Sequence, residues 1–324
     1  MKKLLIYPAL VLAAIAGPAG ATGDYAACVQ REALLSADET RIGDLKQRCR
    51  ERTLEEAAAS SLETAAVDER LALEETVSRN PFVLLAHRPN YFLFASYNSR
   101  PNTAPFDNLD PALAENMQPV EAKFQVSLKL PVAHDLFGGR GNLYFAYTNR
   151  SFWQLYNTAH SSPFRETNHE PEIWLSLRQH LSLAGWEARL LDIGLSHQSN
   201  GRAGSLSRSW NRIYGRIVFG RDNLAVSLRP WIRIPESAEH DDNPDINDYM
   251  GHFELRGVVR NGRTRFSLML RNNLDTRNNR GALELGWTFP IHGHARGYVQ
   301  WFNGYGESLI DYNALTNSIG FGIA

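Results

Sequence analysis

From Arg88 onward the sequence alternates between apolar and polar positions with a period of two residues, which is the pattern of a β-strand. In "FQVSLKL", Phe124, Val126 and Leu128 fall on one face, and Gln125 and Ser127 fall on the other. The same pattern recurs in "IWLSLRQ", "LAVSLRPW", "FELRG", "RFSLMLR" and "ALELGWTF". With similar segments near Tyr91, Leu143, Leu191, Ile213, Val299 and Ile319, it predicts about twelve strands.

The polar faces of these segments carry more charge than one face of a water-exposed sheet requires, but a hydrated barrel lumen accommodates it. The charged residues are Lys129, Arg178, Arg216, Arg229, Glu254, Arg256, Arg265 and Glu284. Connections also alternate between short (220–223) and long (235–248), as do the turns and loops of outer-membrane barrels. A mean hydropathy of −0.35 fits, because lipid-facing and lumen-facing residues average out. The predicted fold is all-β, an antiparallel transmembrane β-barrel of about twelve strands with an N-terminal helical extension; a soluble all-β protein is the alternative.

The N-terminus has the pattern of a secretory signal peptide. Lys2 and Lys3 precede the apolar run "LLIYPALVLAAIAG", and the small residues at 19–21 suit signal peptidase. A membrane-anchoring helix is the alternative, but the run is shorter than the roughly 20 residues that a span needs. We therefore predict a signal peptide over residues 1–21 and export from the cytoplasm.

Residues 22–80 are rich in Ala, Glu and Arg, and we interpret them as a periplasmic extension that is helical or partly disordered. On one unbroken helix Cys28 and Cys49 would lie about 31 Å apart, so a disulfide between them requires a turn. "SADE" at 36–39 matches a capping box that would begin a second helix. Both the bridge and the role of this extension stay open. The barrel is then assigned to residues 81–324.

One hairpin candidate sets polar residues on its apolar face. In the first strand, Leu195 shares a face with the apolar positions before it, and continuing by twos gives His197 and Ser199. In the second strand, counting back by twos from Ile213 reaches Asn211. If the loop centres on Gly204, His197 and Asn211 stand opposite each other with Cβ atoms about 5 Å apart. Polar side chains facing lipid are costly, so this row near the outer end of the barrel requires a functional explanation.

These three residue types are the parts of a nucleophilic triad. Ser199 becomes a nucleophile when a base takes its proton, and His197 can do so near neutral pH. Asn211 can hold the imidazole through its amide oxygen without placing an ion beside lipid. The alternative is a non-enzymatic barrel, a porin or structural protein, in which the row is only an interfacial hydrogen-bond cluster.

"HQSNGRAGSLSRSWNR" resembles the signature of the outer-membrane phospholipase A family, in which a His-x-Ser pair and the Asn of "SRSWNR" form the triad. The segments "SFWQL", "SSPFRETNHEPE", "DDNPDINDYMG" and "NGYGESLIDYN" match the same family. The resemblance covers the chain from about residue 80 onward. It implies a calcium-dependent phospholipase A1/A2 that hydrolyses acyl esters of phospholipids and lysophospholipids and is active as a homodimer.

The same resemblance assigns further roles residue by residue. Gly201 would offer its backbone N–H to the oxyanion, while the Arg202 carbonyl and the Ser207 hydroxyl would bind Ca²⁺. Ser161 would reach the calcium ion of a second protomer. Gly204 departs from the family, because relatives often have an acidic residue there that serves a second calcium position. The implied location is the bacterial outer membrane, with the active site near the outer leaflet and the extension in the periplasm.

Other motifs give less. A net charge of −1 gives no reason to expect nucleic acid, and the sequence has no G-x-S-x-G elbow, P-loop or Rossmann fingerprint. "DDNPDIND" lacks the EF-hand glycine and spacing, so we interpret it as a solvated loop. His292 and His294 favour a surface position over zinc binding. No constellation is indicated for His87, His134, His160, His169, His180, His240 and His252. A soluble periplasmic esterase remains a rival, and the preference between sn-1 and sn-2 esters stays open.

Overall fold

The structure is a computed structural model that describes residues 43, 47, 49, 84–183, 186–293 and 295–324. The predicted signal peptide, Cys28, His294 and most of the extension lie outside the described residues. Gly43, Gln47 and Cys49 are helical and belong to a unit that ends at Thr53. Cys49 is buried and disulfide-bonded. The second unit contains the barrel.

The strands of this unit are long and follow one another with few helices between them. They are β1 (Leu85–Ala86), β2 (Tyr91–Asn98), β3 (Val120–Asp135), β4 (Gly141–Trp153), β5 (Phe164–Leu183), β6 (Trp186–Ser199), β7 (Ser209–Arg221), β8 (Leu224–Ile234), β9 (Phe253–Asn261), β10 (Thr264–Asn272), β11 (Gly281–His292), β12 (Ala295–Tyr305) and β13 (Leu315–Ile323). The helices and 3-10 turns are α4 (Pro111–Asn116), α5 (Leu136–Gly139), η1 (Thr158–His160), η2 (Gly204–Leu206) and α6 (Ile246–Met250). Among the described residues, no helix is both long and apolar enough to cross a membrane.

The sheet closes on itself. Each strand from β3 to β12 pairs antiparallel with the next one in the chain, and β2 pairs with both β13 and β3. The short β1 pairs with β3 beyond the end of β2, so it continues the same edge. This is the predicted closed antiparallel barrel of twelve strands, and each sequence segment that predicted a strand falls in one of β2 to β13.

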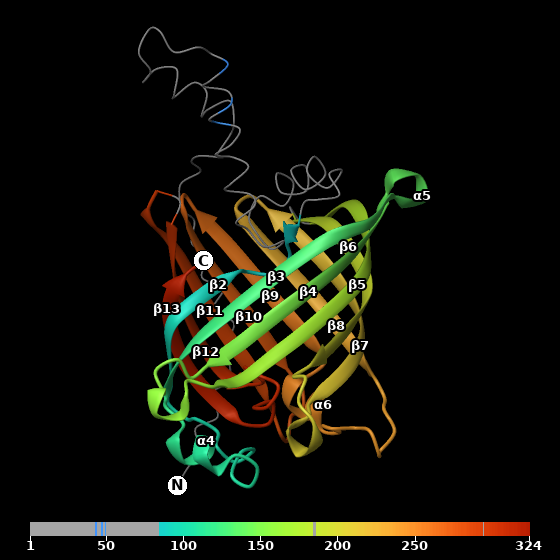
Figure 1. Ribbon diagram of the computed structural model, residues 1–324. Coiled ribbons are helices and arrows are strands. Elements are labelled where there is room, and N and C mark those ends of the chain that lie inside the picture. Colours follow the sequence, from blue (N-terminus) through green and yellow to red (C-terminus); the bar gives the residue numbers. More distant parts are fainter. Residues whose placement is uncertain (1–42, 44–46, 48, 50–83, 184–185, 294) are drawn as a thin grey trace. The chain divides into compact units, whose positions relative to one another are not determined.

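Connections alternate in length around the barrel, as the sequence predicts (Figure 1). Short ones follow β3, β7 and β9, and the last two of these span only 222–223 and 262–263. Long ones follow β2, β8 and β12, at 99–119, 235–252 and 306–314. The connections that carry α4 and α6 lie at the lower end of Figure 1, whereas α5 lies at the opposite end.

The outer wall is apolar and the inner wall is polar. In β6, Ile193 is 59% exposed, whereas the neighbouring Asp192 is 1% exposed. Leu191 and Leu195 are exposed like Ile193, and Ser196 is buried like Asp192. A continuous exposed apolar wall of this kind fits a lipid environment and excludes the soluble all-β alternative.

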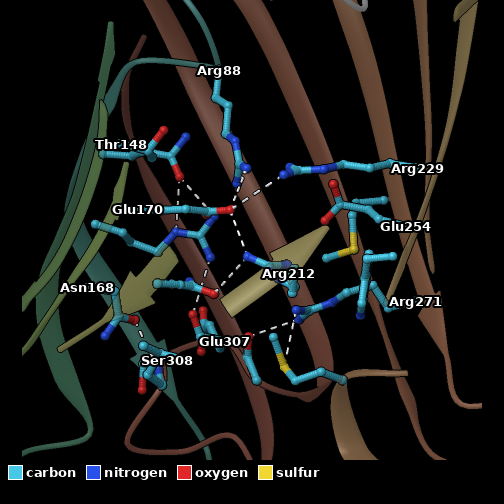
Figure 2. Close-up of a pocket in the computed structure, with 18 of the residues that line it drawn as sticks. Arg88, Thr148, Asn168, Glu170, Arg212, Arg229, Glu254, Arg271, Glu307 and Ser308 are labelled. Carbon is cyan, nitrogen blue, oxygen red and sulfur yellow. Dashed lines mark hydrogen bonds and ion pairs between the residues drawn. The ribbon is translucent and has the colours of Figure 1, made fainter. Parts of the chain in front are cut away.

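The barrel interior contains a network of ion pairs (Figure 2). The Glu170 carboxylate accepts hydrogen bonds of 2.9 Å from both Arg88 and Arg212 and one of 3.0 Å from Ser196. Arg229 approaches the same oxygen to 3.9 Å. The charged residues predicted to face the lumen include Lys129, Arg216 and Arg229, all of which are buried. The alternation therefore separates lipid-facing apolar side chains from paired charges inside.

A packed cluster of buried residues fills part of the lumen. α6 and the β12–β13 connection contribute to this cluster, which also contains aromatic residues of β4, β5, β7 and β8. Its members are Tyr144, Ala146, Trp174, Trp210, Tyr214, Trp231, Ile246, Met250, Leu309 and Tyr312. Burial, together with a hydrogen bond from its hydroxyl to Asp245, raises the pKa of Tyr312. The β6–β7 hairpin is thus supported from inside by close packing.

Gly194 of β6 shows how tight this packing is. A Cβ atom there would lie 2.6 Å from Trp174 Cβ, 2.7 Å from the Ile173 carbonyl oxygen and 2.8 Å from Tyr214 Cζ. We expect Gly194→Ala to lower the free energy of unfolding by about 1–3 kcal/mol, because backbone and rings must move apart. Denaturant unfolding in detergent micelles, followed by tryptophan fluorescence, measures this loss.

Gly257 of β9 provides the matched control. A Cβ atom there would meet nothing within 4 Å. Gly257→Ala should therefore change the free energy of unfolding by less than about 0.5 kcal/mol. Equal losses in the two variants would contradict the packing explanation.

Candidate functional site

The β6–β7 hairpin brings the three candidate residues together. Their strands are antiparallel neighbours, with His197 paired to Asn211 and Ser199 paired to Ser209. The equal spacing around Gly204 predicts the first pair, and the structure contains it. His197 and Ser199 continue the lipid-facing positions of β6, because they follow exposed Leu195 by two and four residues, whereas Ser196 is buried. Asn211 of β7 is paired with His197 and lies on the same face. The row lies at the end of the barrel that carries the long connections.

His197 is hydrogen-bonded to the partner that sequence reasoning assigned to it. Its Nδ1 lies 2.8 Å from Asn211 Oδ1. An amide oxygen only accepts, so Nδ1 carries the proton and Nε2 is left as an acceptor. Ser199 lies two residues further along the same strand face. This arrangement can take a proton from a hydroxyl at the outer wall.

Gly201, the second residue of the hairpin loop, has a backbone conformation that favours glycine. Its φ of +65° is in the left-handed region. A Cβ atom there would lie 3.6 Å from Nε2 of His169, so the loop backbone runs beside that ring. His169 is paired with Ser199 across β5 and β6, and its Nδ1 is 2.5 Å from the Tyr147 hydroxyl. His169, one of the histidines for which the sequence indicated no constellation, is therefore a neighbour of Ser199.

The candidate calcium ligands lie on two connections. Ser207 follows η2 in the hairpin loop and donates a hydrogen bond of 2.6 Å to Asp242 Oδ2. Arg202 is fixed by its guanidinium, which donates to the Arg165 carbonyl at 2.6 Å. Ser161 is exposed and lies in the β4–β5 connection, away in sequence from the hairpin. Within the described part of the chain, no group of three or more His, Cys, Asp or Glu side chains is arranged to hold a metal ion.

Two acidic residues that the sequence did not assign to the site lie next to the row. Glu236 Oε1 accepts a hydrogen bond of 2.8 Å from Asn211 Nδ2. Asp242 accepts from Ser207 and, at 3.4 Å, from Ser209. Both belong to the β8–β9 connection, whose "DDNPDIND" segment we interpret from sequence as a solvated loop without metal. That interpretation stays a prediction, but Asp242 places a carboxylate beside Ser207.

The fold and this row define the class of the protein. It is a membrane-type β-barrel whose apolar outer wall carries a hydrogen-bonded His–Asn pair with a serine on the same face, and these are residue types that a serine ester hydrolase uses. The family model for phospholipase A1 matches residues 67–324. The chain therefore belongs to the phospholipase A1 family, and the barrel and the family together place it among outer-membrane proteins.

Individual relatives agree with this assignment. Phospholipase A1 of Klebsiella pneumoniae is 40% identical over 244 residues, which cover 75% of this chain and 82% of the relative. The crystal structure of a Salmonella typhi outer membrane phospholipase dimer with bound calcium is 37% identical, with a TM-score of 0.72, and the match covers 77% of this chain and 94% of that one.

One further solved structure is that of a mutant protein. It is an active-site mutant of outer membrane phospholipase A from Escherichia coli in which an asparagine is replaced by alanine. It is 39% identical with a TM-score of 0.71, and the match covers 75% of this chain and 92% of that one. The family assignment disfavours the non-enzymatic barrel that the sequence left as the alternative.

Proposed function

We propose that this protein is a calcium-dependent outer-membrane phospholipase that hydrolyses acyl esters of phospholipids and lysophospholipids through Ser199, His197 and Asn211. The observation that carries the proposal is the 2.8 Å contact between His197 Nδ1 and Asn211 Oδ1 on the lipid-facing wall. A polar pair that faces lipid costs stability, so its presence indicates a functional role. The active-site asparagine of the Escherichia coli relative supports the same role for an asparagine here.

The chemistry follows from the proton positions. His197 Nε2 takes the proton of Ser199 as Oγ attacks the ester carbonyl carbon. The bond between that carbon and the alcohol oxygen then breaks, and Nε2 returns the proton to the leaving alkoxide. A water molecule attacks the acyl-serine ester, again giving its proton to Nε2. The free fatty acid leaves, and Ser199 regains its hydroxyl proton from Nε2.

The residues beside the row fit a calcium ion. Calcium prefers oxygen ligands, and the Ser207 hydroxyl lies 2.6 Å from the Asp242 carboxylate, so hard oxygens already converge there. The Arg202 carbonyl and the Ser207 hydroxyl would hold the ion, with Ser161 of the partner subunit completing the site in a dimer. When bound, the ion would add positive charge beside the developing oxyanion. The Gly201 N–H would donate to that oxyanion.

Membrane geometry supports the choice of substrate. The wall next to the row, along β6 and β7, has exposed apolar residues, including Ile193, Leu195 and Ile213. Acyl chains would lie along this wall, and in the groove between two protomers, while the ester reaches Ser199. The calcium-bound dimer of the Salmonella typhi relative supports a dimeric active form. We place the row near the outer leaflet and the extension in the periplasm.

Covalent labelling tests the nucleophile directly. We expect an alkyl sulfonyl fluoride to react with the detergent-solubilised protein at Ser199, because a serine with a proton acceptor attacks the sulfur and displaces fluoride. Mass spectrometry of the digested protein would locate the adduct.

His197→Ala should abolish this labelling while the barrel remains folded. The neighbouring Ser209 serves as an internal control, because its hydroxyl donates to Asp242 and has no paired histidine in the β6–β7 register. The proposed triad would be refuted by an adduct on Ser209. It would also be refuted if Ser199 were labelled at the same rate in His197→Ala as in the unaltered protein.

A further inference from the structure

Glu236 stands directly behind the His197–Asn211 pair. It follows β8 by two residues, and the outward positions before it are Ile232 and Ile234. Ile234 is paired with Asn211 across β7 and β8, which brings the start of the β8–β9 connection to that side chain. Glu236 Oε1 then accepts from Asn211 Nδ2 at 2.8 Å.

We propose that Glu236 is a positioning residue of the proposed hydrolase, fixing the Asn211 amide in the orientation that presents its oxygen to His197. The inference rests on the proposed function, because it assigns Glu236 a place behind the same triad. It adds an acidic fourth member to a row whose orienting residue is otherwise neutral.

The amide of asparagine has two ends with opposite hydrogen-bonding properties. If Asn211 turned over, its NH₂ group would face His197, whose Nδ1 would then have to accept. The imidazole proton would move to Nε2, where the base must be free, and Ser199 could no longer be deprotonated. An ionised carboxylate only accepts, so Glu236 can pair only with the NH₂ end. Its presence therefore selects the productive orientation.

The surroundings of Glu236 leave its carboxylate available to Asn211. Glu236 is half-buried, whereas Pro235 and Ser237 on either side are exposed. The nearest cation along the chain, Arg233, is engaged by Asp241 at 2.5 Å and by the Pro244 carbonyl at 3.1 Å. A hydrogen bond to an ionised, partly shielded group is stronger than one between neutral groups. The carboxylate thus bonds Asn211 at the site without a competing strong ion pair from its own strand.

The first experiment measures kinetics in mixed micelles. Glu236→Ala should lower kcat about tenfold with little change in KM, because orientation of the base is lost and substrate contacts are kept. Glu239→Ala is the matched control, since Glu239 is an exposed glutamate of the same connection, and its rate should equal that of the unaltered protein. A Glu236→Ala variant with full kcat would overturn the proposal while Ser199-dependent hydrolysis still stood.

Exchanging acid and amide makes the test sharper. Asn211→Asp alone should be strongly impaired, because two carboxylates would meet at hydrogen-bond distance. The double variant Asn211→Asp with Glu236→Gln restores one amide and one acid. The new amide NH₂ at position 236 can donate to one oxygen of the new carboxylate at position 211, whose other oxygen faces His197. We expect the double variant to recover at least tenfold over Asn211→Asp. A purely structural role for Glu236 predicts no such recovery, and additive losses would contradict the proposal.

A spectroscopic readout keeps the inference testable without catalysis. Nitrogen-15 NMR of histidine-labelled protein in micelles, with His197 assigned by comparison with His197→Gln, reports which ring nitrogen carries the proton. We expect the proton on Nδ1 in the unaltered protein and a mixture of tautomers in Glu236→Ala. If the unaltered protein released no fatty acid, the proposed function would fail, yet this tautomer shift would still decide the role of Glu236. An identical spectrum in both proteins would overturn it.

Discussion

Replacing Ser199 with alanine should reduce the release of fatty acid from phospholipid in mixed micelles about a thousandfold or more. In the proposed mechanism the hydroxyl is the group of the row that forms a bond to the acyl carbon, so its removal would leave only the weak background attack by water. His197 and Asn211 would keep their hydrogen bond, because Ser199 takes no part in it. Continuous titration of released acid in the presence of calcium measures the effect.

A serine elsewhere in the barrel controls for the substitution itself. Ser99 is exposed in the β2–β3 connection, and its hydroxyl donates to the Asn317 carbonyl at 3.2 Å. Ser99→Ala should keep the full rate. Both variants should show the heat-dependent gel migration of a folded barrel. A folded Ser199→Ala protein that retains more than about a tenth of the activity would eliminate the serine mechanism.

The barrel could be predicted from sequence because its physical rule is local. Lipid on one side and a charged lumen on the other force each strand to alternate, so parity alone gave the faces of β6 and β7. A one-residue error would have turned every side chain to the wrong wall. The His197–Asn211 pair followed because the hairpin between them is regular and the irregularity of this strand pair lies at its other end, between Ala188 and Leu190.

His169 could not be placed in the same way, because the neighbouring strand pair is irregular. Leu183 is paired with Trp186 beside the turn, but the register shifts between Arg178 and Leu181. Counting from the turn would therefore set His169 opposite Asn200, whose side chain is buried on the lumen side. The structure sets it opposite Ser199 instead. A single irregularity, invisible in the hydrophobic pattern, decides whether this ring belongs to the row.

Glu236 and Asp242 escaped prediction for a different reason. Both lie in the long β8–β9 connection, beyond the last residue of the strand, and sequence alone does not say how far the alternation continues there. Glu236 does continue the even-numbered outward positions of Ile232 and Ile234, and extending the parity by one step would have found it. No such rule reaches Asp242, whose contact with Ser207 depends on the folded path of the loop.

Removing calcium should lower the rate of fatty-acid release about a hundredfold or more, because the loss of one group that stabilises an oxyanion has an effect of that size. The neutral side chain of Asn211 adds no charge that could compensate. Chelation in the mixed-micelle assay, followed by re-addition of calcium or of magnesium, measures it; only calcium should restore the rate, since magnesium gives up its water reluctantly. Ser207→Ala should raise the calcium concentration needed for half-maximal activity.

The exposed Ser205, two residues away in the same loop, is the control for that shift. Ser205→Ala should leave the calcium dependence unchanged, because only the backbone carbonyl of Ser205 is engaged, by Arg208 at 2.9 Å. Gly204 carries no carboxylate, whereas Asp242 is hydrogen-bonded to Ser207, so Asp242 is the acidic side chain that would lie beside the proposed calcium site. Full activity in the presence of chelator would show that no calcium ion takes part in the reaction, and would remove Arg202, Ser207 and Ser161 from the site.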